Sequence, residues 1–517
     1  MATGESSTVQ TRMERLFRST VSPSDRNVIV QFLRDSEKEL NTIKAAIMAL
    51  ESKRNGVKKK MERYRSLLAP VHRLPPEILV QVFVECCDEN ELRQKFVPPA
   101  YAISRVCGRW RELALSTPRL WSSLMINFYN WKGQGSRLAS LTQEFIDRSR
   151  TMPLTLDLNF GDAWDAEDVG HIVPALDGLK GHCTRWQSVE LDLVPWIMDS
   201  QLVDIMRNVP TLEHLGLSSD GFDLEPEFTN NFGTMPSLQS LVVPSIFSSP
   251  NQLAIPWWQL KKLELRCTTI RGIMAFIASS TNLEHLTLSG DYLTDGVIQG
   301  NFTIAPNLQS LELHPSRPEN LPQFFDHVTL PKLSSLEIWG SLPLGPGAHP
   351  VYDMTSVMDL VSRSSCQITS LLFSWMKCPE GQVVSLIRRM PSLSTLEIVE
   401  MLDSNSIVCS TFLNQLHMDL DDPSQPCLLP DLSELHLSEL HLSVHFKGLD
   451  TRALLDMLSS RCISVSGTGP SYTSSIAKGL KLVSVRVRGQ GDEVEEFLDS
   501  LRCFENVGVC MDVSSRK

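Results

Sequence analysis

A short phrase, LxxLxL with similar apolar residues allowed, returns along most of this 517-residue chain. Nine copies begin at Leu212, Leu238, Leu260, Leu283, Leu308, Leu333, Ile368, Leu393 and Leu432. Looser copies begin at Trp186 and Leu482, and six of the eight separations between the nine main copies are 22–26 residues. Many copies follow a segment whose apolar residues keep helical spacing, so each unit reads as helix, turn and strand.

One strand and one helix cannot bury their apolar faces alone, so neighbouring units must stack into a continuous core. The pattern therefore predicts an α/β solenoid over residues 150–510, and it resembles a leucine-rich repeat. The second and third apolar residues of each phrase should point inward, while the residues between and after them should line the inner face of the sheet. The Asn or Cys that normally follows the phrase is mostly missing, so the repeats are degenerate.

Five glutamates occupy the same place in five copies of the phrase, so stacking should align them in one row: Glu190, Glu264, Glu312, Glu337 and Glu397. Arg266, His314 and Trp339 stand two residues after three of them. We predict a substrate-binding surface that favours a basic or amphipathic segment, with Trp339 as an apolar anchor. The alternative is ordinary solubilising charge on an exposed strand face.

Residues 70–125, ahead of the repeats, read as a small all-α module. Pro75 and Pro76 fit the start of a helix, because the first turn leaves its N–H groups without intrahelical partners. Apolar residues then recur at three- and four-residue spacings: Ile78, Leu79, Val82 and Phe83. The same spacing returns at Val106, Trp110 and Leu113. Together with the large apolar side chain of Trp121, these residues should form the core of the module.

This order of parts, from LPPEIL through CGRWREL to PRLW, resembles the F-box over Leu74–Leu124. The resemblance implies docking onto the Skp adaptor of a cullin-type ubiquitin ligase. It places the contact at Leu74, Pro75, Ile78, Leu79 and Phe83. The stretch between Glu85 and Ala102 departs from the pattern, since it is longer and more polar than a compact F-box helix. The alternative is a helical hairpin whose apolar residues form only its own core.

Residues 25–69 keep a heptad pattern in which nine of the eleven a and d positions from Leu33 to Leu68 are apolar. Ser36 and Arg54 are the exceptions. Such a repeat predicts a coiled-coil helix, which would allow a homodimer. A hairpin folding back at Asn55-Gly56 satisfies the same periodicity, so the sequence leaves both open. Residues 1–24, rich in Ser and Thr, are expected to be a disordered lead-in.

Composition removes several classes of function. The net charge of −12 argues against a general nucleic-acid binder. No signal-peptide core and no membrane-length apolar run is present, so we expect an intracellular protein, cytoplasmic or nuclear, with no membrane partner. The twelve cysteines contain no CxxC pair. We therefore predict neither a metal site nor a cofactor, and without phosphate-loop, GxSxG or HExxH motifs we predict no catalytic residue.

These features together predict a non-enzymatic substrate-recognition subunit of a Skp/cullin/F-box type ubiquitin ligase. The 70–125 module would dock the adaptor, the repeats would bind a target protein, and other subunits would carry out the ubiquitin chemistry. The alternative function is a self-associating interaction scaffold with no link to ubiquitin.

Overall fold

The structure is a computed structural model, and it describes Glu14, Phe17 and residues 21–131, 133–160, 170, 172–193, 206, 208–219, 235–245, 247–266, 269–290, 303–341, 350–379, 381–400, 407–418, 428–441, 449–462, 479–488, 491–507 and 509–516. The predicted lead-in, residues 1–24, lies largely outside these ranges. The chain divides into two compact units, Met1–Val82 and Phe83–Lys517, and each is described by itself.

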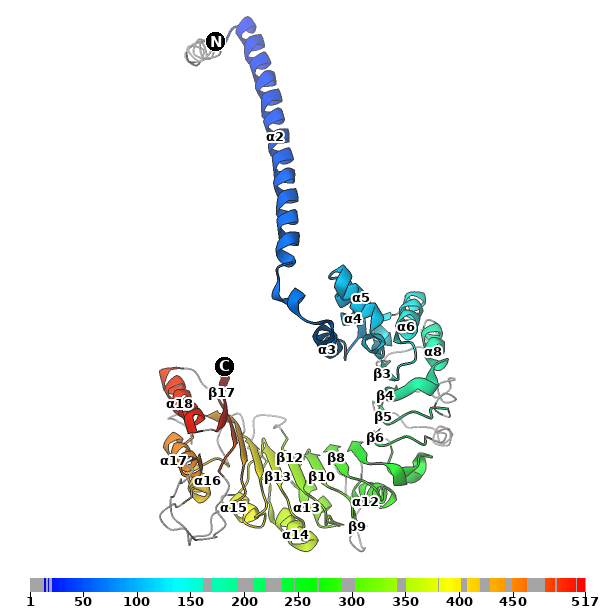
Figure 1. The fold of residues 1–517 in the computed structure, drawn as a ribbon, viewed down its shortest axis with the longest axis vertical. Coiled ribbons are helices and arrows are strands. Elements are labelled where there is room, and N and C mark those ends of the chain that lie inside the picture. The colour runs from blue at the N-terminus through cyan, green and yellow to red at the C-terminus, as the bar shows by residue number, and fades with distance from the viewer. Residues whose placement is uncertain are drawn as a thin grey trace. The chain divides into compact units, whose positions relative to one another are not determined.

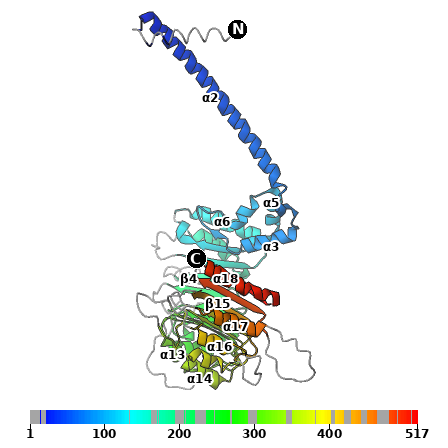
Figure 2. The same cartoon turned by 90° about the vertical axis from the view of Figure 1, so that its left-hand side faces the viewer.

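The first unit is dominated by one long helix, α2 (Pro23–Ser66), of 44 residues (Figure 2). The Ser22 side chain caps its start by accepting a hydrogen bond from the Asp25 backbone N–H at 3.2 Å. The helix continues through Asn55 and Gly56, so the alternative of a hairpin at this dipeptide is wrong. A single glycine costs a helix only about 1 kcal/mol, which is too little to end so long a helix. The 3₁₀ turn η1 (Pro70–Arg73) and the start of α3 (Pro76–Cys86) follow.

The second unit contains a sheet of 15 described strands that are paired in chain order, and every pair is parallel. Its strands are β1 (Glu91–Leu92), β2 (Ser123–Asn127), β3 (Leu154–Asn159), β4 (Trp186–Leu193), β5 (His214–Ser219), β6 (Ser240–Val243), β7 (Lys262–Arg266), β8 (His285–Gly290), β10 (Ser310–Pro315), β12 (Ser335–Trp339), β13 (Ser370–Ser374), β14 (Thr395–Val399), β15 (Glu434–His441), β16 (Leu482–Arg488) and β17 (Cys510–Arg516). Strands β9 (Thr303–Ile304) and β11 (Val328–Thr329) form a separate parallel pair.

Helices of this unit lie along one side of the sheet and leave its other face lined by strands (Figure 1). The α-helices are α4 (Pro99–Ser104), α5 (Gly108–Ser116), α6 (Gly135–Ser149), α8 (Val173–Lys180), α12 (Ile270–Ser279), α13 (Asn320–Phe325), α14 (Thr355–Ser364), α15 (Gln382–Ile387), α16 (Ser410–Leu416), α17 (Thr451–Cys462) and α18 (Asp492–Arg502). The 3₁₀ turns are η2 (Pro118–Trp121), η3 (Phe128–Trp131), η4 (Cys183–Arg185), η5 (Pro250–Gln252), η6 (Trp257–Gln259) and η7 (Cys503–Val507).

The predicted α/β solenoid is confirmed, and its core is the one the phrase predicts. In the copy that begins at Leu212, the residues Leu212, Leu215 and Leu217 are all buried. The residue between the last two, Gly216, belongs to the row that faces away from this core. Each phrase thus places its apolar residues between the sheet and the helices.

The solenoid begins earlier than predicted. Strands β1 and β2 belong to the same sheet, although both lie inside residues 70–125, which we expected to be all-helical. The predicted boundary at residue 150 is therefore wrong. Leu124 and Ile126 are buried and alternate with half-buried residues, as in a strand that packs one face on the core. The helical module and the first repeats share one sheet.

Side-chain hydrogen bonds link neighbouring repeats at the start of the phrase, ahead of the place where regular repeats carry an asparagine. In the later repeats, the hydroxyl at the second position of the phrase donates to the backbone carbonyl at the same position one repeat earlier, as from Ser394 to Thr369 at 3.0 Å. Earlier repeats use the residue just before the phrase, as when Asn282 donates to the Trp258 carbonyl at 2.8 Å. These bonds link consecutive repeats through side chains, beside the backbone pairing of the strands.

Candidate protein-interaction surfaces

An aromatic cluster around Trp121 holds the helices of the predicted docking module together. The Trp121 indole N–H donates to the Ala114 carbonyl at 2.8 Å. Its ring meets the edges of Tyr101 and Phe145, with centroids 5.4 Å and 5.1 Å away. Trp121 is fully buried, as predicted for the module core. Since Phe145 lies on α6, this core extends into the first repeats.

The polar stretch between Glu85 and Ala102 folds around one buried amide, that of Asn90. Its side-chain NH₂ donates to the carbonyls of Cys87 and Leu120 at 2.8 and 2.9 Å. Its side-chain oxygen accepts from the Ala100 backbone N–H at 3.1 Å. The amide thereby ties the end of α3 to the start of α4 and to the PRLW turn. Nothing in the sequence marks Asn90, because it is an isolated polar residue in a polar stretch.

The five predicted adaptor contacts divide into two groups. Leu74, Pro75 and Ile78 are exposed, with Ile78 at 43%. Leu79 and Phe83, each at 1%, are buried, so the prediction that these two contact the adaptor is wrong. Consecutive helix positions point about 100° apart, and a wide apolar stripe therefore splits between a buried side and an exposed one. Phe83 instead packs against Trp110, with ring centroids 4.8 Å apart.

Two other residues of this module differ in exposure or position from what the sequence predicted. Val106 was predicted to be core but is 60% exposed, because it lies in the link between α4 and α5 rather than on either helix. Val82 is 48% exposed and stands four residues after Ile78, on the same face of α3. The periodicity had marked Val82 as part of the stripe without assigning it to the contact. Trp110 and Leu113 are half-buried.

The strand register aligns all five predicted glutamates in one row across the sheet. We call this the central row, and it runs Asp157, Glu190, Gly216, Val242, Glu264, Thr287, Glu312, Glu337, Leu372 and Glu397. The predicted alignment is thus correct, although uncharged residues interrupt the acidic ones. Asp157, on β3, is an acidic member that the phrase did not reveal.

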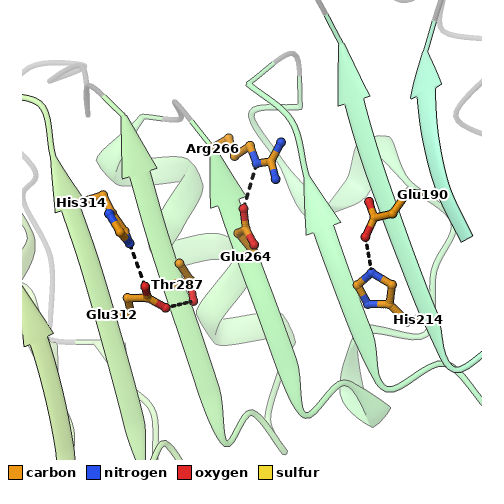
Figure 3. A network of polar contacts seen from close by, with 7 residues as sticks. All are labelled: Glu190, His214, Glu264, Arg266, Thr287, Glu312 and His314. Atoms are coloured by element: carbon orange, nitrogen blue, oxygen red, sulfur yellow. Dashed lines mark hydrogen bonds and ion pairs between the residues drawn. The ribbon is translucent and has the colours of Figure 1, made fainter. Parts of the chain in front are cut away.

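Basic side chains of the neighbouring row contact two of the glutamates (Figure 3). The guanidinium of Arg266 lies 2.8 Å from the Glu264 carboxylate. The ring of His314 lies 2.8 Å from one oxygen of Glu312, and the Thr287 hydroxyl donates to the other oxygen at 3.1 Å. The centre of the inner face therefore pairs carboxylates with basic side chains and is not a purely acidic stripe.

A third contact of this kind lies on the earlier strands β4 and β5 (Figure 3). His214 meets the Glu190 carboxylate at 2.6 Å with one ring nitrogen and the Ser240 hydroxyl at 2.8 Å with the other. Gly216 makes room for this arrangement, since a Cβ there would lie 1.6 Å from an oxygen of Glu190. His214 was not predicted as a site residue, because it occupies a different place in the phrase from Arg266 and His314.

Trp339, the predicted anchor, stacks on His314 with ring centroids 5.6 Å apart and planes inclined by 13°. Beside it, burial and the neighbouring Glu312 raise the pKa of Glu337 above its ordinary value. Burial, followed by Glu190 and Asp192, likewise raises the pKa of Asp157. The inner face therefore combines an aromatic platform with carboxylates that would be stabilised by an added positive charge.

Within the described ranges, no group of three or more His, Cys, Asp or Glu side chains is placed to hold a metal ion. No helix among the described residues has the length and apolar character needed to cross a membrane.

Comparison with known proteins gives one match in sequence. The family model described as F-box-like matches residues 71–127. No curated protein matches the chain significantly.

Three solved structures align with the chain at low identity. They are an internalin from Listeria monocytogenes (14% identity, 65% of this chain and 69% of that one, TM-score 0.26), Toll from the Drosophila Toll–Spätzle complex (13%, 73% and 48%, 0.25) and Rad7 from the yeast Rad7–Elc1 complex (15%, 66% and 91%, 0.27). These TM-scores are low, so the solenoid is assigned from its own strand order and register.

Proposed function

The chain carries an F-box-like domain at residues 71–127 ahead of a leucine-rich-repeat-like solenoid, and from these two parts we propose that it is a substrate-recognition subunit of a Skp/cullin/F-box type ubiquitin ligase. The F-box-like domain would bind a Skp-type adaptor, and through it a cullin. The solenoid would bind the target protein. The observation that carries the proposal is the domain match together with the apolar residues exposed on that domain.

Leu74, Ile78 and Val82 supply the adaptor contact in this proposal. All three are at least 36% exposed, and Ile78 and Val82 share one face of α3. Exposed apolar side chains gathered on one short helix are typical of a surface that a partner covers. Leu79 and Phe83 support this contact from beneath, since their burial fixes which side of the helix faces outward.

The inner face of the solenoid supplies the target contact. Its carboxylates Glu264 and Glu312, with the basic side chains of Arg266 and His314 beside them, favour a segment with basic residues and set its register, while Trp339 offers an apolar anchor. This chain performs no chemistry in the proposal, and it requires no cofactor. Holding target and ligase together converts ubiquitin transfer from a chance encounter into a positioned reaction.

The test is adaptor capture by the full chain carrying Ile78→Asp and Val82→Asp. Placing two carboxylates in an apolar contact should weaken adaptor binding at least about 30-fold, since hot-spot residues each contribute about 2 kcal/mol or more. The matched control is Ile304→Asp, another exposed apolar residue, which lies on β9 outside the F-box-like domain. It should bind the adaptor as the unaltered protein does.

Failure of the unaltered chain to bind the adaptor would contradict the proposal and favour the self-associating scaffold with no ubiquitin link. Equal binding by the double variant would contradict the assignment of Ile78 and Val82 as contacts. Circular dichroism on each variant shows whether the fold is retained.

A further inference from the structure

Helix α2 exposes an apolar seam along its length and has no buried residue among its 44. In heptad terms the a positions are Leu33, Leu40, Ile47, Arg54 and Met61, with Leu68 just beyond the end of the helix, and the d positions are Ile29, Ser36, Ile43, Leu50, Val57 and Tyr64. From Leu33 to Leu68, the apolar members are each between 49% and 78% exposed. A long helix in water gains most of its stability by packing this kind of face.

Charges beside the seam differ between the two halves of the helix. The e and g positions of the first half carry Glu37, Glu39 and Glu51, with Lys44 as the one basic residue among them. The same positions in the second half carry only basic charges: Lys53, Lys58, Lys60 and Arg65. Since e and g residues set partner choice and orientation in coiled coils, this asymmetry distinguishes the two directions in which a second copy could lie.

A parallel pair of α2 helices brings like charges together. In that arrangement each g residue faces the e residue five positions later on the other helix. Lys53 then meets Lys58 and Lys60 meets Arg65, in each case twice by symmetry. Arg54 also faces the second copy's Arg54 inside the seam. The attraction between Glu39 and Lys44 is the one favourable charge pair, so parallel pairing is opposed.

An antiparallel pair reverses this balance. When Leu33 lies opposite Tyr64 and Ile43 opposite Arg54, the seam aligns over nearly its full length. The flanking pairs are then Glu37 with Lys58, Glu39 with Lys60 and Lys44 with Glu51, each formed twice and each attractive.

The charge pattern also selects this register among antiparallel ones. A shift of one heptad in one direction places Lys53 opposite Lys53, and a shift in the other places Glu37 opposite Glu51. Like charges at such close positions destabilise the pair, so both shifts are opposed.

We propose that α2 binds α2 of a second copy of this chain as an antiparallel coiled coil in this register. The proposal goes beyond the ubiquitin-ligase role and stands whether or not that role is correct. With a rise of 1.5 Å per residue, the two Ser66 residues lie on opposite sides of the midpoint of the coiled coil and are about 50 Å apart along its axis. The chains therefore leave the coiled coil at opposite ends.

The test measures dimerisation of the full chain by sedimentation equilibrium. In the antiparallel register, Lys58→Glu with Lys60→Glu turns four attractive pairs into repulsive ones, so the dimer dissociation constant should rise at least about tenfold. In a parallel pair the same change creates attraction to Lys53 and Arg65 and tightens the dimer. The matched control, Lys38→Glu with Lys59→Glu, changes the same charge at f positions on the outer face and should leave the constant unchanged.

Adding Glu37→Lys and Glu39→Lys to the Lys58→Glu, Lys60→Glu variant should restore dimerisation, because every reversed pair becomes attractive again. Tightening by Lys58→Glu with Lys60→Glu would overturn the proposed orientation. A monomeric unaltered chain at about 100 µM, whether it is free or binds another protein through α2, would overturn the proposal altogether. Circular dichroism on every variant excludes simple loss of the helix.

Discussion

At the scale of single residues, Asp157 shows how packing in the sheet changes the pKa of a side chain that nothing in the sequence marks as unusual. Burial raises the pKa of its carboxyl, and Glu190 and Asp192 raise it further. The register explains the crowding, since Asp157 pairs with Glu190 across β3 and β4. A site that holds these groups close together destabilises the ionised form, which an approaching basic segment would stabilise.

This crowding predicts a measurable pH dependence. A carboxyl whose folded-state pKa is raised makes the folded protein bind the proton more tightly than the unfolded chain does. Its contribution to the free energy of unfolding is therefore present at low pH and is lost as the pH rises from about 3.8 through the raised folded-state value.

Asp157→Asn should remove this dependence and raise the Tm at pH 7 by on the order of 1 °C, with the difference shrinking below about pH 4. Thermal unfolding across this pH range checks the result, and Asp177→Asn, exposed on α8, is the control. A lower Tm for Asp157→Asn at pH 7 would show that the carboxylate is stabilised rather than crowded.

Residues of the F-box-like domain show what periodicity can and cannot predict. It found the apolar stripe of α3 correctly, including Ile78 and Leu79. It could not predict that Leu79 is buried while Ile78 is exposed, because the stripe is wider than one contact needs. Val106 was misplaced for a related reason: it keeps helical spacing with Trp110 but precedes the helix.

At the scale of elements, the phrase predicts strands well because its apolar residues form the core. Each of its eleven copies falls at a strand, from β4 to β16. Among the described strands of the 15-stranded sheet, the four that it missed are β1, β2, β3 and β17. Strand β2 carries a loose copy of the phrase from Trp121 to Ile126, which was read as part of the helical module. Strands β1, β3 and β17 lack the full phrase, and they are strands because a neighbour supplies the parallel pairing. Pairing of this kind is a property of the stack and leaves no mark inside one repeat.

The inner face makes a prediction about target capture. Glu312→Lys with Glu337→Lys reverses two adjacent charges of the central row, and it should reduce binding of target proteins about tenfold while leaving adaptor binding unchanged. Quantitative mass spectrometry of proteins captured from cells checks this.

The matched control is Glu493→Lys with Glu496→Lys on α18, which makes the same change in net charge at exposed positions outside the central row. If the same proteins are lost with the control, or none is lost with either variant, the central row does not bind targets.

At the scale of the whole molecule, the chain carries three surfaces that we propose as sites of interaction: the α2 seam, the exposed residues of the F-box-like domain and the central row. Sequence alone predicted all three, because each rests on a repeated or clustered residue pattern. What it could not predict was whether residues 25–69 form one helix or a hairpin, or that the sheet begins inside the helical module. Both depend on which segments of the chain meet.

Adaptor affinity tests the central claim most directly. In a calorimetric titration of a purified Skp-type adaptor into the intact chain, we expect one adaptor per chain and a Kd of about 1 µM or tighter, with binding lost in the Ile78→Asp, Val82→Asp variant. A folded, unaltered chain that gives no binding at about 100 µM adaptor would contradict the account.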